Sequence, residues 1–232
     1  LKKRNITKLI VLGGNGSFNA LKIFSQEFDI SVVGIPATID NDIYESSYTL
    51  GVDTALNVIK NALDDIRNTS SSSKRAFVVE TMGRDFGYLA AVSAITSGAE
   101  ICLIPEIKID YESLEKKLKK EIKNGRDYIL ALVSEGTKQT EELALWIQTN
   151  LKMQTRKIVL GHLQRGGNPS VFERRMANEF VVYSIDKLRK EKMKSAIVYK
   201  NCKFKFIDLE TISNKKQVLN KKIIKQLEHM VK

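Results

Sequence analysis

The sequence predicts an α/β protein with mostly parallel sheets and helices on both faces. Short β-branched runs alternate with longer amphipathic stretches along the whole chain, a pattern typical of parallel strands joined by helices. The 232 residues are 43% hydrophobic and 28% charged, which supplies a buried core and argues against disorder. A chain of this length forms one large domain or two small ones.

Strands are predicted where short β-branched runs lie between turn residues. These runs cover Thr7–Leu12, Ile30–Ile35, Ala76–Glu80, Glu100–Ile104, Tyr128–Ser134 and Ser195–Lys200, with a shorter one at Lys157–Leu160. The first run follows a basic segment typical of the tail of a helix that leads into an interior strand. Since the sequence begins with Leu1 rather than Met, we expect it to be a fragment of a longer protein.

Helices are predicted between these strands. Leu50–Arg67 has the clearest helical period, because its apolar residues recur every three or four positions on one face. Thr140–Leu151 opens with a threonine followed by acids, and Ser170–Lys190 is similarly periodic, so both are predicted as helices. The polar stretch Thr69–Ser73 is predicted to be a loop.

Polar segments that contain glycine follow five of the predicted strands. They are GGNGS at 13–17, PATIDND at 36–42, ETMGRDFG at 80–87, SEG at 134–136 and GHLQRGG at 161–167. In parallel α/β sheets, ligands bind at the carboxyl ends of the strands. We therefore expect these five loops to share one edge and to form the functional site.

The first two of these loops indicate phosphoryl transfer. A glycine turn that opens a helix presents backbone N–H groups to an anion. Asp40 and Asp42 follow a strand on one short loop, where an acid can take the proton of an attacking hydroxyl while a metal neutralises phosphate charge. Taken alone, the glycines also suit an ordinary tight turn, and the acids also suit capping of the next element.

The net charge of +11 is compatible with nucleic-acid binding. The lysines, however, alternate with acids or apolar residues at helical spacing in 115–126, 188–194 and 220–226, as on a solvated helix face. We therefore expect no nucleic-acid partner. A positive field also suits sugar phosphates and nucleotides.

The sequence carries no sign of membrane insertion or export. No apolar run approaches the ~18 residues of a transmembrane helix, and the start lacks a signal-peptide pattern. Cys102 and Cys202 are isolated, without the CxxC spacing of metal or redox motifs. We expect reduced thiols, no membrane partner and a cytoplasmic location.

Four segments together resemble the phosphofructokinase family. They are PATIDND, TSSSSKR, ETMGRDFGYLA, and LGHLQRGGNPS followed by an ER pair. The resemblance covers essentially the whole chain and implies two Rossmann-like three-layer domains with the active site in the cleft between them. It implies a glycolytic kinase that transfers a phosphoryl group to the 1-hydroxyl of fructose 6-phosphate, giving fructose 1,6-bisphosphate. The donor is ATP in most members and pyrophosphate in some, and Mg²⁺ accompanies the nucleotide.

The resemblance also divides the chain between the two domains. Residues 1–51 and 164–217 would form the phosphoryl-donor (nucleotide) domain, which would be N-terminally incomplete. Residues 52–163 and 218–232 would form the fructose 6-phosphate domain.

Catalytic roles follow from the same resemblance. Asp40 would be the general base, and Asp42 would orient the loop or help to organise the metal. Thr38 would contact the transferring phosphate, and Arg84 would stabilise the charge that builds on it. The nucleotide phosphates would be bound by Gly14, Asn15, Gly16 and Ser17.

The resemblance assigns the sugar phosphate to a further set of residues. Met82 and Gly83 would contact the sugar, and Glu135 would accept hydrogen bonds from its hydroxyls. The 6-phosphate would be held by Arg75, Arg156, His162 and Arg165, and arginine suits this because its planar fork binds phosphate oxygens bidentately. Taken alone, His162 suits a packed or capping histidine, and Arg75 suits a surface ion pair.

Two further expectations concern assembly and control. In the family, Arg75 and Arg156 act on the neighbouring subunit's site, which implies a homo-oligomer, a tetramer by resemblance. The effector site of bacterial members would use Arg67, Gly98, Glu100 and Arg126. Asn124 and Asp127 replace other residues of the family in the same loop, so we expect weaker or different control by nucleotide diphosphate or phosphoenolpyruvate.

The chain departs from the family in two respects. Asn15 stands where the family usually has an aspartate that contacts Mg²⁺, and an amide brings no charge to a metal that favours carboxylates. We therefore expect weak metal and nucleotide binding. The family's first strand, with its own phosphate loop, and a nucleotide-holding segment are not in the sequence, so we expect the chain alone to phosphorylate poorly or not at all.

Two positions bear on the phosphoryl donor. Pyrophosphate users usually carry Asp where this chain has Gly16 and Lys where it has Ala37, so both residues favour ATP. The alternatives are a pyrophosphate-dependent sugar kinase and a regulatory subunit that binds sugar phosphate without catalysis. Asn15 and the missing segment motivate the regulatory alternative, while the intact Asp40, Asp42 and Arg84 oppose it. A nucleic-acid-binding module is a further alternative that only the charge supports.

Overall fold

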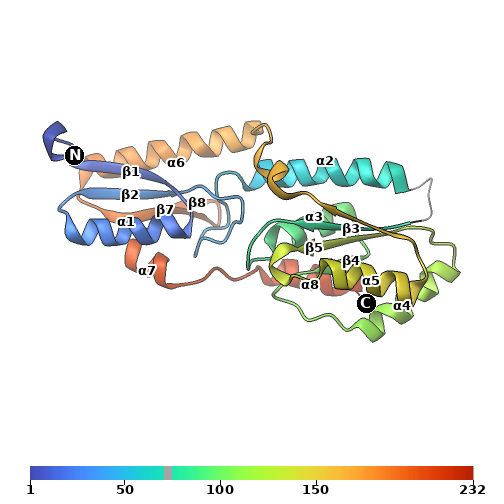
Figure 1. Ribbon diagram of the computed structural model, residues 1–232. Helices are drawn as coiled ribbons and strands as arrows, with labels where there is room; N and C mark the ends of the chain where they lie inside the picture. The colour runs from blue at the N-terminus through green and yellow to red at the C-terminus, as the bar shows by residue number, and fades with distance from the viewer. Residues whose placement is uncertain (71–74, 232) are drawn as a thin grey trace. The chain divides into compact units, whose positions relative to one another are not determined.

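The computed structural model describes residues 1–70 and 75–231 and divides into two compact units, shown in Figure 1. Unit 1 comprises Leu1–Thr54 and Asn168–Val218, and unit 2 comprises Ala55–Gly167 and Leu219–Lys232. Helix α2 (Val52–Ser70) begins in unit 1 and continues into unit 2.

Unit 1 is built on a four-stranded sheet of order β1-β2-β7-β8. Its strands are β1 (Lys8–Gly13), β2 (Ser31–Pro36), β7 (Lys194–Lys200) and β8 (Lys203–Asp208). β1, β2 and β7 are parallel, whereas β7 and β8 pair antiparallel. The central β2 is buried along its whole length, as expected for a parallel strand covered on both faces.

Helices cover both faces of this sheet. α1 (Asn15–Glu27) and α7 (Leu209–Asn214) pack on one face, and α6 (Val171–Lys190) packs on the other. On the α1 side, the core brings together apolar residues of helices and strands, among them Phe18, Leu21, Val32, Val198 and Ile212. A 3₁₀ turn, η1 (Lys2–Arg4), precedes β1.

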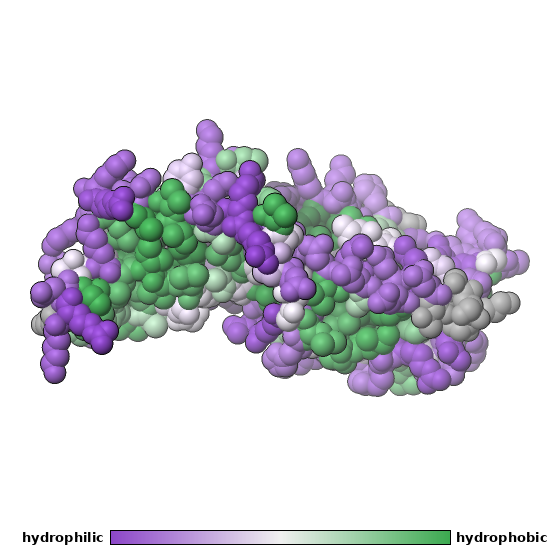
Figure 2. All heavy atoms as spheres, turned by 90° about the horizontal axis from the view of Figure 1, so that it is seen from above, coloured by the Kyte–Doolittle hydropathy of each residue, from purple (hydrophilic) through white to green (hydrophobic). Residues whose placement is uncertain are grey.

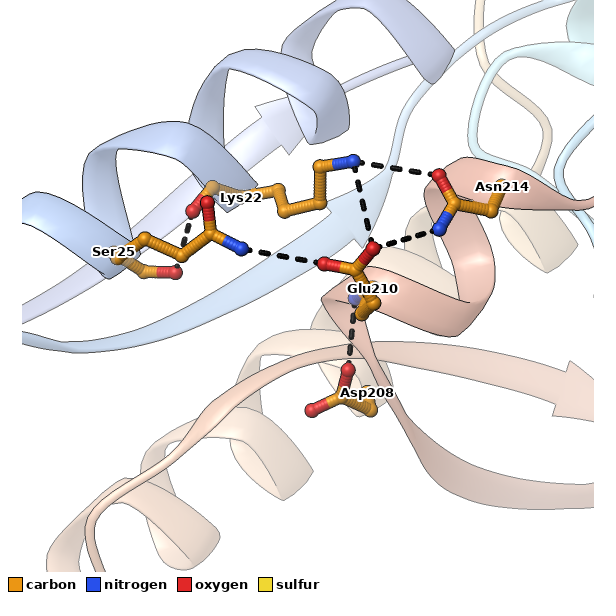
Figure 3. A network of polar contacts seen from close by, with 6 residues as sticks. Lys22, Ser25, Asp208, Glu210 and Asn214 are labelled. Carbon is orange, nitrogen blue, oxygen red and sulfur yellow. Dashed lines mark hydrogen bonds and ion pairs between the residues drawn. The ribbon is translucent and has the colours of Figure 1, made fainter.

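A polar network joins α1 to α7, as Figure 3 shows. Glu210 accepts hydrogen bonds from the side chains of Gln26 at 3.2 Å and Asn214 at 2.7 Å, and lies 3.9 Å from the Lys22 ammonium. Asp208 caps α7 by accepting from the Glu210 backbone N–H at 2.8 Å. Most of these side chains are exposed, so the network orients α7 more than it stabilises the fold.

Unit 2 is built on a parallel sheet of order β4-β5-β3-β6. Its strands are β3 (Ala76–Thr81), β4 (Ile101–Leu103), β5 (Ile129–Ser134) and β6 (Thr155–Val159). α3 (Tyr88–Ser97) and α8 (Lys221–Val231) pack on one face, and α4 (Tyr111–Lys123) and α5 (Thr140–Leu151) lie on the other. The 3₁₀ turns η2 (Glu135–Thr137) and η3 (Gly161–Arg165) follow β5 and β6. The predicted α/β class with mostly parallel sheets is confirmed.

The expectation that all five glycine-containing loops share one edge is wrong. GGNGS and PATIDND follow β1 and β2 in unit 1, while the other three loops follow β3, β5 and β6 in unit 2. Each set lies at the carboxyl edge of its own parallel strands. The alternation of strands and helices predicts parallel pairing but does not specify which sheet a strand joins.

Other local features complete the comparison. β1 is an edge strand of the described sheet, and the short 3₁₀ helix η1 precedes it. β8 was not among the predicted strands. The predicted loop Thr69–Ser73 overlaps the end of α2, and its remainder lies outside the described residues. None of the helices in the described ranges has the length and hydropathy needed to cross a bilayer.

Candidate active site

The predicted acid loop follows β2 in unit 1. Asp40 is only 4% exposed, and Asp42 is half-buried. Asn41 lies between them in a left-handed conformation, with φ of 53°, which non-glycine residues rarely adopt without support. The Asn41 amide supplies that support by donating to the Ser47 carbonyl at 3.3 Å. The loop therefore holds its acids in one conformation.

A returning stretch of chain braces the acid loop. The Leu50 backbone N–H donates to the Pro36 carbonyl at 2.9 Å, and the Thr49 hydroxyl donates to the Thr38 carbonyl at 2.7 Å. Thr38 in turn orients the first acid, because its hydroxyl oxygen accepts from the Asp40 backbone N–H at 3.2 Å. A hydroxyl that accepts in this way still has its own proton to donate.

The glycine loop opens α1 directly beside the acid loop. α1 starts at Asn15, and its N-cap Gly14 has no side chain to cap the first backbone N–H groups, so these N–H groups are available to an anion. A Cβ at Gly14 would lie 3.4 Å from the Thr38 Cβ, whereas Gly16 has open space around it. Ser17 is half-buried in the first turn of the helix.

Asn15 joins the two loops of unit 1. Its amide nitrogen Nδ2 donates to Asp42 Oδ2 at 2.8 Å and lies 3.4 Å from the Asp42 carbonyl oxygen. Mg²⁺ bound with a nucleotide takes one or two carboxylates, together with phosphates and water. Asp42 offers one carboxylate, but the Asn15 amide already bonds one of its oxygens. Within the described ranges, no group of three or more His, Cys, Asp or Glu forms a metal site. The donors therefore fit a weakly held Mg²⁺ that arrives with phosphates.

In unit 2, Glu135 organises the loop that carries Arg84. Glu135 Oε1 accepts from the backbone N–H groups of Gly83 at 3.2 Å and Arg84 at 2.9 Å. Gly83 has φ of 133° and Arg84 has φ of 51°, so this turn depends on the two hydrogen bonds and on a glycine. Gly136 has no room for a Cβ, because the Arg84 carbonyl oxygen occupies that space. The Arg84 side chain is exposed at the tip.

Gln164 is a site residue that the sequence did not reveal. It is fully buried, accepts from the Met82 backbone N–H at 3.2 Å through Oε1 and donates to the Gly161 carbonyl at 3.0 Å through Nε2. It thereby connects the loop after β3 to the turn after β6, where His162 and Arg165 are exposed. The only sequence signal was its place between two basic residues of one motif.

Arg75 and Arg156 lie at the other end of the same sheet. Arg75 immediately precedes β3 and donates to the Gln154 side chain at 2.8 Å, and Arg156 pairs with Phe77 near the start of the strands. Met82, by contrast, follows the end of β3. A strand of six residues separates its ends by roughly 17–20 Å. Within one chain, these two arginines therefore do not join the other predicted phosphate ligands.

The predicted effector residues gather elsewhere in unit 2. Gly98, Glu100 and Arg126 line a cavity of about 330 Å³ with Lys117 and His229. A Cβ at Gly98 would lie 3.9 Å from the Arg67 guanidinium, which donates to the Ser97 carbonyl.

The acids of this cavity are paired internally. Arg126 forms ion pairs with both Glu100 and Glu121. Burial raises the pKa of Glu100, against the opposing influence of the Leu130 N–H and of Arg126. The two contributions act in opposite directions, and removal from water outweighs the contacts.

Known sequences and structures share this architecture. The phosphofructokinase family profile matches residues 1–188. The chain belongs to the phosphofructokinase family. A Sulfurimonas denitrificans protein named ATP-dependent 6-phosphofructokinase is 49% identical over 224 residues, which cover 96% of this chain and 70% of the relative. A Sulfurovum relative of the same name is 46% identical, with 97% and 69% covered.

Solved phosphofructokinases share the fold of this family member at low sequence identity. Saccharomyces cerevisiae phosphofructokinase superposes with a TM-score of 0.85 at 24% identity, covering 91% of this chain and 32% of the yeast chain. A pyrophosphate-dependent phosphofructokinase from Marinobacter aquaeolei superposes with a TM-score of 0.82 at 18% identity, covering 99% and 69%. At these identities, the likeness carries the fold alone.

Proposed function

We propose that this chain is part of an ATP-dependent 6-phosphofructokinase, which transfers the terminal phosphoryl group of ATP to the 1-hydroxyl of fructose 6-phosphate. The observation that carries the proposal is the braced acid loop, which holds Asp40 at 4% exposure beside a half-buried Asp42. The names of the Sulfurimonas and Sulfurovum relatives support the same activity. The product, fructose 1,6-bisphosphate, belongs to glycolysis in the cytoplasm.

Unit 1 supplies the proton acceptor in this proposal. Asp40 takes the proton of the 1-hydroxyl as the bond to phosphorus forms. The Thr38 hydroxyl, which already accepts from the Asp40 N–H, donates to the transferring phosphate. The N–H groups at the start of α1, with Gly14, Gly16 and Ser17, bind the donor phosphates.

Unit 2 supplies the groups that bind the substrate anion. Arg84 offsets the charge that develops on the phosphoryl group, and the turn around Met82 and Gly83 contacts the sugar. The 6-phosphate binds His162 and Arg165 at η3. Arg75 and Arg156 act on the site of a neighbouring copy, since they lie at the opposite end of their sheet, and this makes the enzyme a homo-oligomer such as a tetramer.

Mg²⁺ and the allosteric site complete the proposal. Asp42 and the amide oxygen of Asn15 would hold Mg²⁺ together with the ATP phosphates, and the ion would neutralise phosphate charge when bound. Gly16 and Ala37 favour ATP over pyrophosphate because both leave space for the nucleotide. The cavity beside Glu100 and Arg126 binds an effector weakly, because its acids already have an internal partner.

The deciding experiment follows fructose 1,6-bisphosphate formation with ATP and, separately, with pyrophosphate, and measures fructose 6-phosphate binding by calorimetry. Product formed with ATP but not with pyrophosphate supports the proposal. Product formed with pyrophosphate but not with ATP would make pyrophosphate the phosphoryl donor. If fructose 6-phosphate binds but neither donor gives product, the regulatory alternative takes its place. Among the alternatives, the Asn15–Asp42 hydrogen bond favours the regulatory subunit, since it engages an oxygen of Asp42 that would otherwise bind Mg²⁺.

A further inference from the structure

The first turn of α6 contains a buried glutamate with no part in the proposed chemistry. Glu173 is 5% exposed. Its Oε1 accepts from the Tyr48 hydroxyl at 2.6 Å and the Gly51 N–H at 2.7 Å. Its Oε2 accepts from the Thr54 N–H at 3.0 Å and the Thr54 hydroxyl at 2.9 Å. Each carboxylate oxygen thus receives two hydrogen bonds from a segment more than a hundred residues away in sequence.

The local sequence predicts a different partner for the Glu173 carboxylate, the backbone N–H of Ser170. Ser170 caps α6 and accepts from the Glu173 N–H at 3.1 Å, so the segment Ser170–Glu173 has the S-x-x-E pattern of a capping box. In a complete capping box, the glutamate side chain would turn back to the N–H of the serine. Here it points instead to residues 48–54, and the Ser170 hydroxyl donates to Asp53 in the same segment.

The same contacts cap the start of α2. The N–H groups of Gly51 and Thr54 belong to the beginning of this helix, where backbone donors have no acceptor within the helix. A carboxylate is favoured at this end of a helix because of the helix dipole. Glu173 therefore fixes the first turn of α2 against the first turn of α6.

The segment that Glu173 holds is the one that braces the acid loop. Tyr48 and Gly51, its two partners on Oε1, flank Thr49 and Leu50, which bond the carbonyls of Thr38 and Pro36. A Cβ at Gly51 would lie 3.2 Å from the Ile39 side chain, so the segment packs directly on the residue before Asp40. Loss of the Glu173 contacts would loosen the brace at both ends.

We propose that Glu173 is a positioning residue, which fixes residues 48–54 so that they hold Thr38 and Asp40 in the geometry for proton transfer. The inference rests on the proposed role of Asp40. It makes a specific claim about kinetics, because displacement of a base by about 1 Å can lower a rate 10²-fold while binding groups elsewhere stay in place. A residue that served the fold alone would have no such selective effect.

The test compares two glutamine variants of the same helix. Glu173→Gln keeps the side-chain shape but converts one acceptor oxygen to an amide donor, so two of its four hydrogen bonds lose their acceptor. Glu179→Gln is the matched control, because Glu179 is partly exposed and lies 3.7 Å from Arg175 in a surface ion pair. Kinetics with fructose 6-phosphate and ATP are measured on both, together with amide hydrogen exchange.

For Glu173→Gln we expect a kcat lowered about tenfold or more, a KM for fructose 6-phosphate within about twofold, and faster exchange confined to residues 37–51. Glu173→Asp, which keeps the charge, should regain part of the loss in kcat. Glu179→Gln should match the parent chain. An unchanged kcat in Glu173→Gln contradicts the proposal, as does exchange that rises equally in the strands of unit 2.

Two further variants cover a failure of Glu173→Gln to fold. Tyr48→Phe and Thr54→Val each remove one hydroxyl donor, and both should show the same kcat effect at smaller size. If the parent chain shows too little turnover for kinetics, exchange in residues 37–51 of Glu173→Gln still decides whether this side chain holds the acid loop. No increase there would overturn the inference independently of activity.

Discussion

Unit 1 and unit 2 present their charged site residues in opposite ways. In unit 1, Asp40 and Asp42 lie on a braced and largely buried loop. In unit 2, the exposed tips of turns carry Arg84, His162 and Arg165. The buried Gln164 makes the hydrogen bonds that connect these turns. A base needs a fixed position and little water around it, whereas a phosphate ligand must be reached from solvent. The contrast matches the two tasks proposed for these residues.

The units differ in their surfaces as well. Among the described residues, the exposed large hydrophobic side chains of unit 2 are Leu145, Val159 and Leu163, while unit 1 carries more. Those of unit 1 include Leu12 on β1 and Val182, Tyr183 and Ile185 on α6, and Figure 2 shows hydrophobic surface spread over unit 1. Unit 1 thus combines the more protected loop with the more apolar exterior.

The largest effect is expected from removal of Asp40, the proposed base in unit 1. Asp40→Asn keeps the shape of the side chain but cannot accept the hydroxyl proton, so kcat should fall by about 10²–10⁴-fold with fructose 6-phosphate affinity unchanged. Steady-state kinetics and calorimetry measure the two quantities. Asp29→Asn is the control, because Asp29 forms an exposed ion pair with Lys192 at 2.9 Å. Full activity of Asp40→Asn would remove the acid loop from the chemistry.

A second challenge removes a cation from unit 2. Arg165→Ala should raise the KM for fructose 6-phosphate by about 10–100-fold, because a charge-assisted hydrogen bond contributes about 1.5–3 kcal/mol, and should change kcat much less. Arg189→Ala, an exposed arginine on α6, should leave both constants unchanged. If Arg165→Ala lowers kcat alone, the division of labour between the units is wrong.

A third prediction concerns the close packing of Gly136 against the Arg84 turn in unit 2. Gly136→Ala would place a methyl group on the Arg84 carbonyl oxygen, which should lower the free energy of unfolding by about 1–3 kcal/mol and weaken substrate binding. Urea denaturation gives the first effect. Gly166→Ala is the control, since a Cβ there meets the Leu163 carbonyl at an ordinary 3.6 Å. Equal stability of the two variants would contradict the packing described.

The smallest effect concerns Asn15 in unit 1. Asn15→Asp removes the hydrogen bond of 2.8 Å to Asp42 and places two carboxylates side by side. These carboxylates repel each other when no metal is bound, and together they bind Mg²⁺ better than Asp42 does alone. We expect a lower melting temperature without Mg²⁺ and a rise on Mg²⁺ addition that exceeds the parent's by a few degrees, about what 1 kcal/mol produces. Thermal scans in ATP-free buffer, with and without Mg²⁺, measure both melting temperatures. The same Mg²⁺ response in both proteins, with unchanged turnover, would show that Asn15 does not weaken metal binding.

Local features of the fold were predictable from sequence, and long-range ones were not. α5 begins and ends at the predicted residues, Thr140 and Leu151, because a polar start and a clear period define it locally. β8 was missed, although its alternating lysines and apolar residues are typical of a half-exposed strand, and its pairing with β7 is seen only in the folded chain. The division of strands between two sheets likewise depends on tertiary packing.

The same division applies to the candidate site. Asp40 was predicted from the acid loop after its strand, whereas the roles of Arg84 and Arg165 were predicted from the resemblance to the phosphofructokinase family. No role was predicted for Glu173 or Gln164, because Glu173 bonds Gly51 and Gln164 bonds Met82, and only the folded chain brings these distant residues together. Motifs predict the groups proposed to meet a ligand, while the buried residues that position these groups are seen only in the structure.

The order of strands in unit 1 also sets an order for biosynthesis. β2 pairs with β7, so this sheet cannot close until residue 200 has left the ribosome. The strands of unit 2 are all present once Val159 has been made. During translation at about 5–20 residues per second, unit 2 can therefore complete its sheet several seconds before unit 1. The segment that braces the acid loop gains its contacts with Glu173 of α6 only after the strands of unit 2 have been made.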